Sequence, residues 1–229
     1  MRVDELRPID KAMVYHPMAH PPQIWFANDL HFGVNPVTDV QKATFKGLYG
    51  GDYQKLELFM NDAEMEQRRV KDADLDIFYW HLLNQFWAVK GGVNYFYRPT
   101  LTPYFQPGFG VEGLLPYFIE TDVRSYLYAG SFKVDVELDR DIQITNNFFI
   151  GLGLRGIFAT KTVEDAIIGS GLNKMQYTIT PYYRLQPGLS IFAEFEHEVY
   201  YGPYKNLQIN LLGSSNTDNS LSFGVEVVF

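Results

Sequence analysis

The side chains best suited to binding a transition metal are gathered near the start of the chain. Met13, His16, Met18 and His20 lie within one short segment. Thioether sulfur suits copper(I) and imidazole suits copper(II), so such a segment could meet both oxidation states of copper. Neighbouring prolines keep the segment extended, and the four side chains would converge only by wrapping around an ion. The alternative interpretation is a flexible lead-in whose Met and His residues are incidental.

A second set of residues with possible chemistry consists of acidic side chains that recur on one face of successive strand-like segments. These acids are Asp72, Asp74, Asp76, Glu120, Asp122, Glu194 and Glu196. Rings of Asp and Glu favour cations in pores, so the pattern predicts a cation pathway. Basic residues share these faces, namely Lys55, Lys90, Arg98, Arg124, Lys133, Arg155 and Arg184. A salt-bridge lattice with a purely structural role is therefore the competing interpretation.

Catalytic motifs are weak throughout the chain. The triplet Gly169-Ser170-Gly171 lacks the Gly-x-Ser-x-Gly frame of a nucleophile elbow, and it does not stand in the context of a phosphate loop. His197 beside Glu198 lacks the second His of a zinc-protease helix. His31 and His81 also stand singly. We expect that the protein is not an enzyme; the enzyme alternative is a membrane-embedded hydrolase or acyltransferase.

Composition excludes several other classes of protein. The formal net charge of -8 argues against nucleic-acid binding, which needs a basic surface. The chain has no Cys, so disulfides, thiolate metal sites and a Cys nucleophile are excluded. No apolar run approaches the roughly 18 residues of a transmembrane helix. Charged residues at the start break any signal-peptide core, so an outer-membrane protein of this sequence would be a processed or engineered form.

The elements that must position these side chains are strands, because apolar and polar residues alternate with period two from Gln23 onward. Residues 1–22 form an irregular, Pro-containing segment, and residues 23–229 form one domain. The predicted strands are 23–34, 41–49, 53–61, 70–81, 85–98, 105–113, 117–128, 132–144, 148–160, 173–185, 189–200 and 221–229. Each is near the ~9–11 residues that a tilted strand needs to cross a bilayer.

The connections between these strands alternate in length, which is typical of an up-and-down membrane barrel. Tight turns are predicted at 50–52, 83–84, 115–116, 146–147 and 186–188, and looser loops at 35–40, 62–69, 99–104, 160–172 and 202–219. The segment 129–131 is short where a long loop is expected. An even strand number places both termini on one side of the membrane, which we expect to be the periplasmic side.

The last strand and the aromatic residues favour a membrane barrel over a soluble one. In 221–229 one face is apolar, the other is mostly polar, and the chain ends on Phe229. Aromatic residues expected on the apolar face near strand ends are Tyr79, Trp87, Tyr95, Tyr97, Tyr183 and Tyr200, as in an interfacial girdle. We predict an all-β, closed antiparallel transmembrane β-barrel of about 12 strands in the bacterial outer membrane. A secreted or periplasmic soluble β binding module is the alternative.

Three motifs resemble those of the copper resistance protein B family of outer-membrane proteins. The run 49–56 is similar to its Gly-Gly-Asp-x-x-Lys-Leu strand pair, and 110–122 to its Gly-x-x-Gly-Leu-Ala-Pro-Tyr-Trp core. Residues 168–172 resemble its Gly-Ile-Gly-Ser-Gly-Leu loop. The resemblance spans Trp25–Phe229 and departs from the pattern at Leu115 and Phe118. The long Met/His-rich leader expected upstream is missing, and 13–20 would be its remnant.

The resemblance implies a barrel that handles copper ions beside a periplasmic multicopper oxidase, in contact with outer-membrane lipid. We expect weak copper binding at Met13, His16, Met18 and His20, which would deliver ions to or from an acidic lumen. A structural outer-membrane barrel without transport remains an alternative. Neither the residues nor the resemblance fixes the direction of copper movement.

Overall fold

The computed structural model describes residues 25–66, 69–99, 101–213 and 215–229, and these residues form twelve strands. The segment that carries Met13, His16, Met18 and His20 lies outside the described residues. The strands are β1 (Trp25–Val34), β2 (Val40–Gly50), β3 (Gln54–Glu66), β4 (Arg69–Leu82), β5 (Trp87–Tyr97), β6 (Tyr104–Leu115), β7 (Ile119–Tyr128), β8 (Ser131–Gln143), β9 (Phe148–Ala159), β10 (Gly171–Gln186), β11 (Leu189–Tyr200) and β12 (Thr217–Val228). The described helices are η2 (Pro116–Phe118), η3 (Glu164–Ala166) and α2 (Gly202–Leu212).

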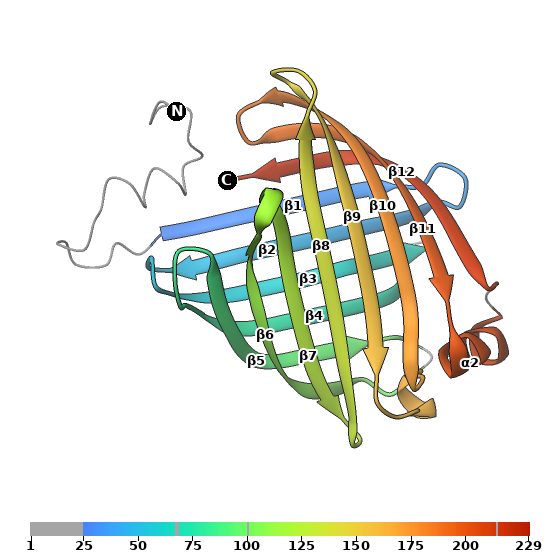
Figure 1. Ribbon diagram of the computed structural model, residues 1–229. Coiled ribbons are helices and arrows are strands. Elements are labelled where there is room, and N and C mark those ends of the chain that lie inside the picture. The colour runs from blue at the N-terminus through green and yellow to red at the C-terminus, as the bar shows by residue number, and fades with distance from the viewer. Residues whose placement is uncertain (1–24, 67–68, 100, 214) are drawn as a thin grey trace.

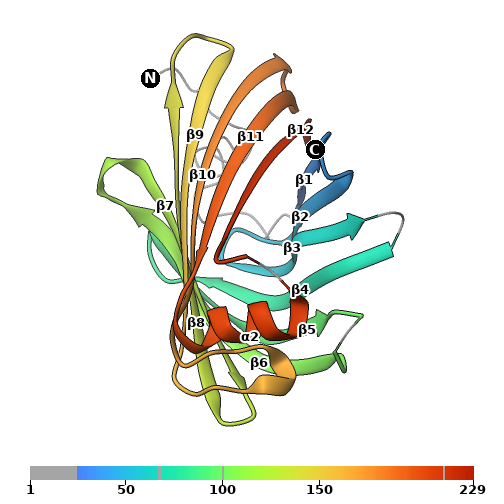
Figure 2. The ribbon, with the colours of Figure 1, turned by 90° about the vertical axis from the view of Figure 1, so that its right-hand side faces the viewer.

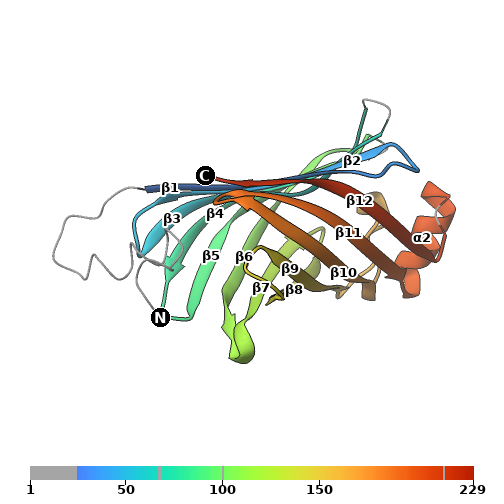
Figure 3. The ribbon, with the colours of Figure 1, turned by 90° about the horizontal axis from the view of Figure 1, so that it is seen from above.

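The strands close into a single antiparallel barrel (Figure 1). Each strand pairs with its neighbours in sequence, and β1 closes the sheet against β12 in a register that runs from Asp29–Val228 to Val34–Phe223. Figure 3 shows these two strands side by side along one wall. Closure pairs the backbone groups that would otherwise form two open edges. The predicted closed, up-and-down barrel of about 12 strands is confirmed.

The two ends of the barrel differ in their connections. At one end, which we call the turn end, Phe229 exchanges two backbone hydrogen bonds with Asn28 at the start of β1, of 2.8 and 3.0 Å. The predicted tight turns lie at this end, and the predicted longer loops lie at the opposite end, which we call the loop end. The connection between β7 and β8 at the loop end is indeed short, with only Ala129 and Gly130 between the strands. The periplasmic location of the turn end stays a prediction.

Period-two alternation places apolar side chains outside and polar side chains inside. In β12, Leu221, Phe223 and Val225 are exposed on the outer surface, whereas Ser222 is buried in the interior. Tyr79 and Tyr183 are exposed on the outside, as predicted for an aromatic girdle. Tyr200 was predicted on the apolar face but lies on the inner one, where its hydroxyl donates to Glu198 at 2.6 Å. The even-numbered positions of β11 all point inward, and Tyr200 follows this rule.

Several local bounds were predicted wrongly: β3 extends to Glu66 into the predicted loop 62–69, and β12 begins at Thr217 rather than 221. The segment 202–219 was expected to be a loop, but it contains α2, which begins after Tyr201 with Pro203 in its first turn and ends at Gly213. Gly213 adopts the left-handed conformation that terminates helices, and its N–H donates to Gln208 and Ile209 carbonyls. Strand β7 begins at Ile119 rather than 117, because Tyr117 and Phe118 have positive φ angles in a turn. No helix in the described part of the chain is long and apolar enough to cross a bilayer.

Candidate functional site

The middle of the barrel is filled by a buried cluster around Lys90. The Lys90 ammonium lies 3.0 Å from Glu57, 3.2 Å from Glu112 and 2.7 Å from Asp122, and the side chains of Lys90 and Glu57 are fully buried. Lys46 on β2 shares Glu112 at 2.8 Å. Strands β2, β3, β5, β6 and β7 are thus joined through their inward side chains. We call Lys90, Glu57, Glu112 and Asp122 the Lys90 cluster.

A second cluster surrounds Arg124 on β7. Its guanidinium lies 2.5 Å from Glu137, 3.7 Å from Asp135 and 3.8 Å from Asp76. Arg155 on β9 makes a two-pronged interaction with Asp135, at 2.9 and 2.6 Å. Such a fork on a carboxylate is geometrically specific and stronger than a single bond. We call Arg124, Asp76, Asp135, Glu137 and Arg155 the Arg124 cluster.

The predicted basic residues make two kinds of contact, ion pairs and cation–π contacts, and Lys90, Arg98 and Arg124 make both. Lys90, Arg98, Arg124 and Arg155 form ion pairs with carboxylates, and Arg98 pairs with Asp72 at the loop end. The other three basic residues lie over aromatic rings that also point inward. These contacts are Lys55 over Trp80 at 4.2 Å, Lys133 over Tyr126 at 4.7 Å and Arg184 over Phe149 at 4.7 Å. A cation over a ring face is attracted by the quadrupole of the ring.

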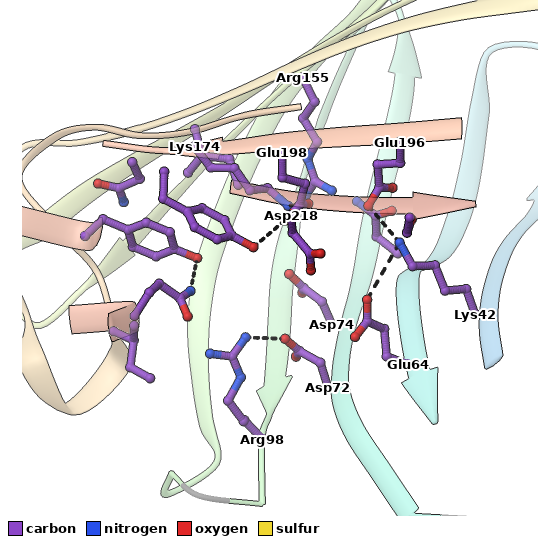
Figure 4. Close-up of a pocket in the computed structure, with 18 of the residues that line it drawn as sticks. Lys42, Glu64, Asp72, Asp74, Arg98, Arg155, Lys174, Glu196, Glu198 and Asp218 are labelled. Atoms are coloured by element: carbon purple, nitrogen blue, oxygen red, sulfur yellow. Dashed lines mark hydrogen bonds and ion pairs between the residues drawn. The ribbon is translucent and has the colours of Figure 1, made fainter. Parts of the chain in front are cut away.

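Two cavities flank the filled middle, one at each end. The turn-end cavity has a volume of about 640 Å³ and the loop-end cavity about 590 Å³. Among the predicted acids, Glu120, Asp122 and Glu194 line the turn-end cavity. Asp72 and Asp74 line the loop-end cavity (Figure 4), and Glu196 lines both. Asp76 lines neither cavity and is buried within the Arg124 cluster, where it also accepts a hydrogen bond from Tyr126.

The two cavities differ in charge. Ten carboxylates and four Lys or Arg side chains line the turn-end cavity. These acids are Asp29, Glu112, Glu120, Asp122, Glu137, Asp139, Asp141, Glu194, Glu196 and Glu226. The loop-end cavity has six carboxylates against five Lys or Arg side chains and is nearly balanced. A cleft lined by one sign of charge between low-dielectric walls concentrates ions of the opposite sign, so the turn-end cavity attracts cations.

Within the described residues, no three His, Asp or Glu side chains converge in a way that would hold a metal ion. His31 points into the turn-end cavity, with its Nε2 3.8 Å from Glu194 and its ring stacked on Phe192. His197 instead contacts Asn219 at 2.6 Å. The predicted copper ligands at the start of the chain lie outside the described residues, so that site stays a prediction.

Part of the loop end is covered by a cap formed by residues 163–170, between β9 and β10, and by α2. Ala166 and Ile168 pack on Tyr104 in a small apolar cluster. Figure 2 shows α2 lying beside this loop, and a Cβ at Gly169 would stand only 2.2 Å from the backbone N of Tyr204. Only glycine permits so close an approach, which gives the Gly169-Ser170-Gly171 motif a packing role. Burial raises the pKa of the Tyr204 phenol, which accepts a hydrogen bond from Gln208.

Several charged residues of the interior were not among the predicted site residues. They are Lys42, Lys46, Glu57, Glu64, Glu112, Asp135, Glu137, Lys174 and Glu198. The period-two pattern could have identified most of them. Glu57, for example, lies two residues after Lys55 and therefore faces the same side of the strand. Glu64 could not be found in this way, because a bulge between Asn61 and Glu64 changes which residues face inward.

These features define an integral outer-membrane β-barrel with a charged, largely filled lumen. A closed barrel with an apolar exterior is one of the two folds that satisfy every backbone group in lipid. The family model described as copper resistance protein B precursor matches residues 26–229. The chain belongs to the copper resistance protein B family.

Solved structures support the fold alone. The NanC porin has a TM-score of 0.55 at 13% identity, with 87% of this chain and 98% of that chain covered. A chain from a study of the in-meso crystallization of membrane proteins has a TM-score of 0.50 at 10% identity, with 89% and 83% covered. None of the curated proteins compared with this chain matches it.

Proposed function

We propose that the protein is a passage for copper ions across the outer membrane in copper resistance. The observation that carries this proposal is the excess of carboxylates in the turn-end cavity. Ten carboxylates face four lining basic side chains, and six when Lys90 and Arg124, which pair with three of the ten, are counted. Copper ions are cations, and an acidic vestibule raises their local concentration. Membership of the copper resistance protein B family supports copper as the cation. In this proposal the protein is a conduit and not an enzyme.

The proposal is tested by copper flux into liposomes that contain the purified protein and an encapsulated copper-sensitive dye. The informative variant combines Glu120→Gln, Asp139→Asn and Asp141→Asn. Glu120 and Asp139 are cross-strand neighbours, and Asp141 lies two residues further along the same face of β8. One unit charge about 6 Å from an ion in water changes its local concentration by roughly threefold, so copper flux should fall by at least that factor.

A matched control neutralises the same residue types outside the lumen, with Glu164→Gln, Asp165→Asn and Asp39→Asn. Glu164 and Asp165 lie in η3 and Asp39 lies in the loop before β2, and all three residues are exposed. The control should retain the flux of the unmodified protein. Equal flux in the two triple variants, or no copper flux through the unmodified barrel, would contradict the proposal.

A structural barrel without transport is the second candidate, and the Lys90 and Arg124 clusters favour it. Their fully buried charges bind neighbouring strands together and fill the middle of the lumen. Under this alternative the variants would change unfolding and leave flux at the background of empty liposomes. The same liposome assay with a parallel unfolding measurement therefore separates the two candidates.

The segment with Met13, His16, Met18 and His20 is proposed as a transient copper-binding site that serves this passage. Copper titration of the protein against a variant with all four residues changed to Ala tests the site. Equal stoichiometry and affinity in both proteins would exclude it. A periplasmic multicopper oxidase is the partner that we propose for the copper delivered, and co-purification with such an oxidase would test that association.

A further inference from the structure

The two cavities meet at a small group of residues near the middle of the lumen. Lys42, Asn61 and Glu196 line both cavities. The Lys42 ammonium lies 2.8 Å from Glu196 on β11 and 3.7 Å from Glu64 on β3 (Figure 4). The Lys42–Glu196 contact therefore reaches over β1 and β12, which separate β2 from β11 in the barrel. This ion pair stands across the junction of the two cavities.

The wall beneath the ion pair is made of small inward-facing residues. Gly33 on β1 and Ser222 on β12 are in direct proximity, since a Cβ at Gly33 would lie 3.3 Å from the Ser222 hydroxyl. The Phe192 ring covers this part of the wall, since a Cβ at Gly33 would lie 3.4 Å from its Cζ and one at Gly224 only 2.4 Å from it. Across the junction itself the two cavities are separated by the Lys42–Glu196 ion pair, whose Lys42 side chain is long and flexible.

The junction also carries oxygen atoms that suit a cation. Gln176 donates to Glu196 at 2.8 Å, and within the described residues its Oε1 has no hydrogen-bond partner, although the side chain is more than nine-tenths buried. Two carboxylates and an amide oxygen are hard donors of the kind that bind hydrated and divalent cations. The Lys42 ammonium occupies the position that such a cation would take.

We infer that Lys42 is a tethered cation that blocks a cation site made by Glu64, Glu196 and the Gln176 carbonyl, and that it controls passage between the two cavities. A permeating cation would replace the ammonium between the carboxylates, and the flexible stem would let it swing aside. Lys42 is thus a specificity-determining residue, because an anion meets two carboxylates when the ammonium moves. This inference rests on the proposed function, since it assumes that ions cross the lumen.

The test is electrical and uses potassium chloride rather than copper. The protein and a Lys42→Gln variant are inserted into planar bilayers, and conductance and reversal potential are measured under a salt gradient. Loss of one positive charge beside the pathway should raise cation conductance by roughly threefold and shift the reversal potential toward cation selectivity. Millimolar calcium should then reduce the variant current, because the vacated carboxylates and amide oxygen would bind it.

Two further variants keep the result interpretable. Lys161→Gln is the matched control, because Lys161 is exposed in the connection between β9 and β10 and lines neither cavity. Lys42→Arg retains a tethered cation and should conduct like the unmodified protein. Circular dichroism of each variant verifies that the barrel is folded.

Equal conductance and selectivity in Lys42→Gln and Lys161→Gln would overturn the inference. A larger potassium current in Lys42→Gln with no copper flux in the unmodified protein would uphold the gate and contradict the proposed function. Copper flux in the unmodified protein that does not change in Lys42→Gln, together with unchanged potassium currents, would uphold the proposed function and contradict the gate.

Discussion

Replacing Lys90 by Met should destabilise the barrel more than replacing any exposed lysine. In the folded protein the Lys90 ammonium neutralises Glu57, Glu112 and Asp122 at 2.7–3.2 Å. Methionine keeps much of the side-chain volume and removes the charge. Lys46 would remain 2.8 Å from Glu112 and 4.0 Å from Glu57, and Arg124 would remain 3.7 Å from Asp122. The loss of a neutralising charge would cost most at Glu57, because its side chain is fully buried.

The size of the effect follows from burial. Removing one partner of a buried ion pair costs about 3–5 kcal/mol. Glu112 and Asp122 retain side-chain exposures of 29% and 16%, so solvent screens part of their repulsion. We therefore expect the free energy of unfolding to fall by about 3 kcal/mol, the low end of that range. A Glu57→Gln and Lys90→Met double variant should recover about 1–2 kcal/mol, because it removes the most buried uncompensated charge as well.

The assay is urea unfolding in detergent micelles, followed by tryptophan fluorescence. Lys161→Met is the matched control, since Lys161 is exposed in the loop between β9 and β10. A surface substitution of this kind should change the free energy of unfolding by less than about 0.5 kcal/mol. The reasoning would be refuted if Lys90→Met unfolded at the same urea concentration as Lys161→Met. It would also be refuted if the double variant were less stable than Lys90→Met alone.

Three further predictions follow from the loop-end cap and the Arg124 cluster. Gly169→Ala would place a Cβ 2.2 Å from the Tyr204 backbone and should displace α2. Trypsin should therefore cleave after Lys205 faster in this variant than in the control Gly91→Ala, whose Cβ meets nothing closer than 3.7 Å. Equal cleavage rates in the two variants would contradict the packing role of Gly169. Because burial raises the pKa of Tyr204, the folded protein holds that proton more tightly, and the stability of the docked α2 is complete below the ordinary pKa near ~10 and falls as pH rises above it. Subtracting the 295 nm titration of Tyr204→Phe should reveal one phenol that ionises above that pH, and ionisation at or below it would be the opposing result. Asp76→Asn should lower the free energy of unfolding by about 1.5–3 kcal/mol, because it weakens the contacts of Asp76 with Tyr126 and Arg124, and it should not lower cation conductance. The double variant Asp72→Asn with Asp74→Asn should lower cation conductance, because both residues line the loop-end cavity. Lower conductance in Asp76→Asn and unchanged conductance in the double variant would place Asp76 on the pathway.

The sequence determined the architecture because strand geometry is local. Side chains alternate with period two, so Leu221, Phe223 and Val225 had to share a face opposite Ser222 wherever the strand was placed. A chain with such alternation over about 12 segments can satisfy its backbone in lipid only by closing into a barrel. The short connections between successive strands likewise determined that neighbours in sequence pair in the sheet, because a tight turn can join only adjacent antiparallel strands. The inward location of Asp72, Asp74, Glu194 and Glu196 followed from this alternation alone.

Tertiary structure decided which interior charges meet. Lys42 and Glu196 are 154 residues apart in sequence and come together only because β1 closes on β12. The bulge between Asn61 and Glu64 turns Glu64 toward Lys42, and period-two alternation does not anticipate such a change. The same holds for α2, which lacks a clear apolar stripe and is fixed by its Gly213 cap and its contact with Gly169. Electrostatic pairing inside a barrel depends on distances across the lumen, and these exist only once the sheet has closed.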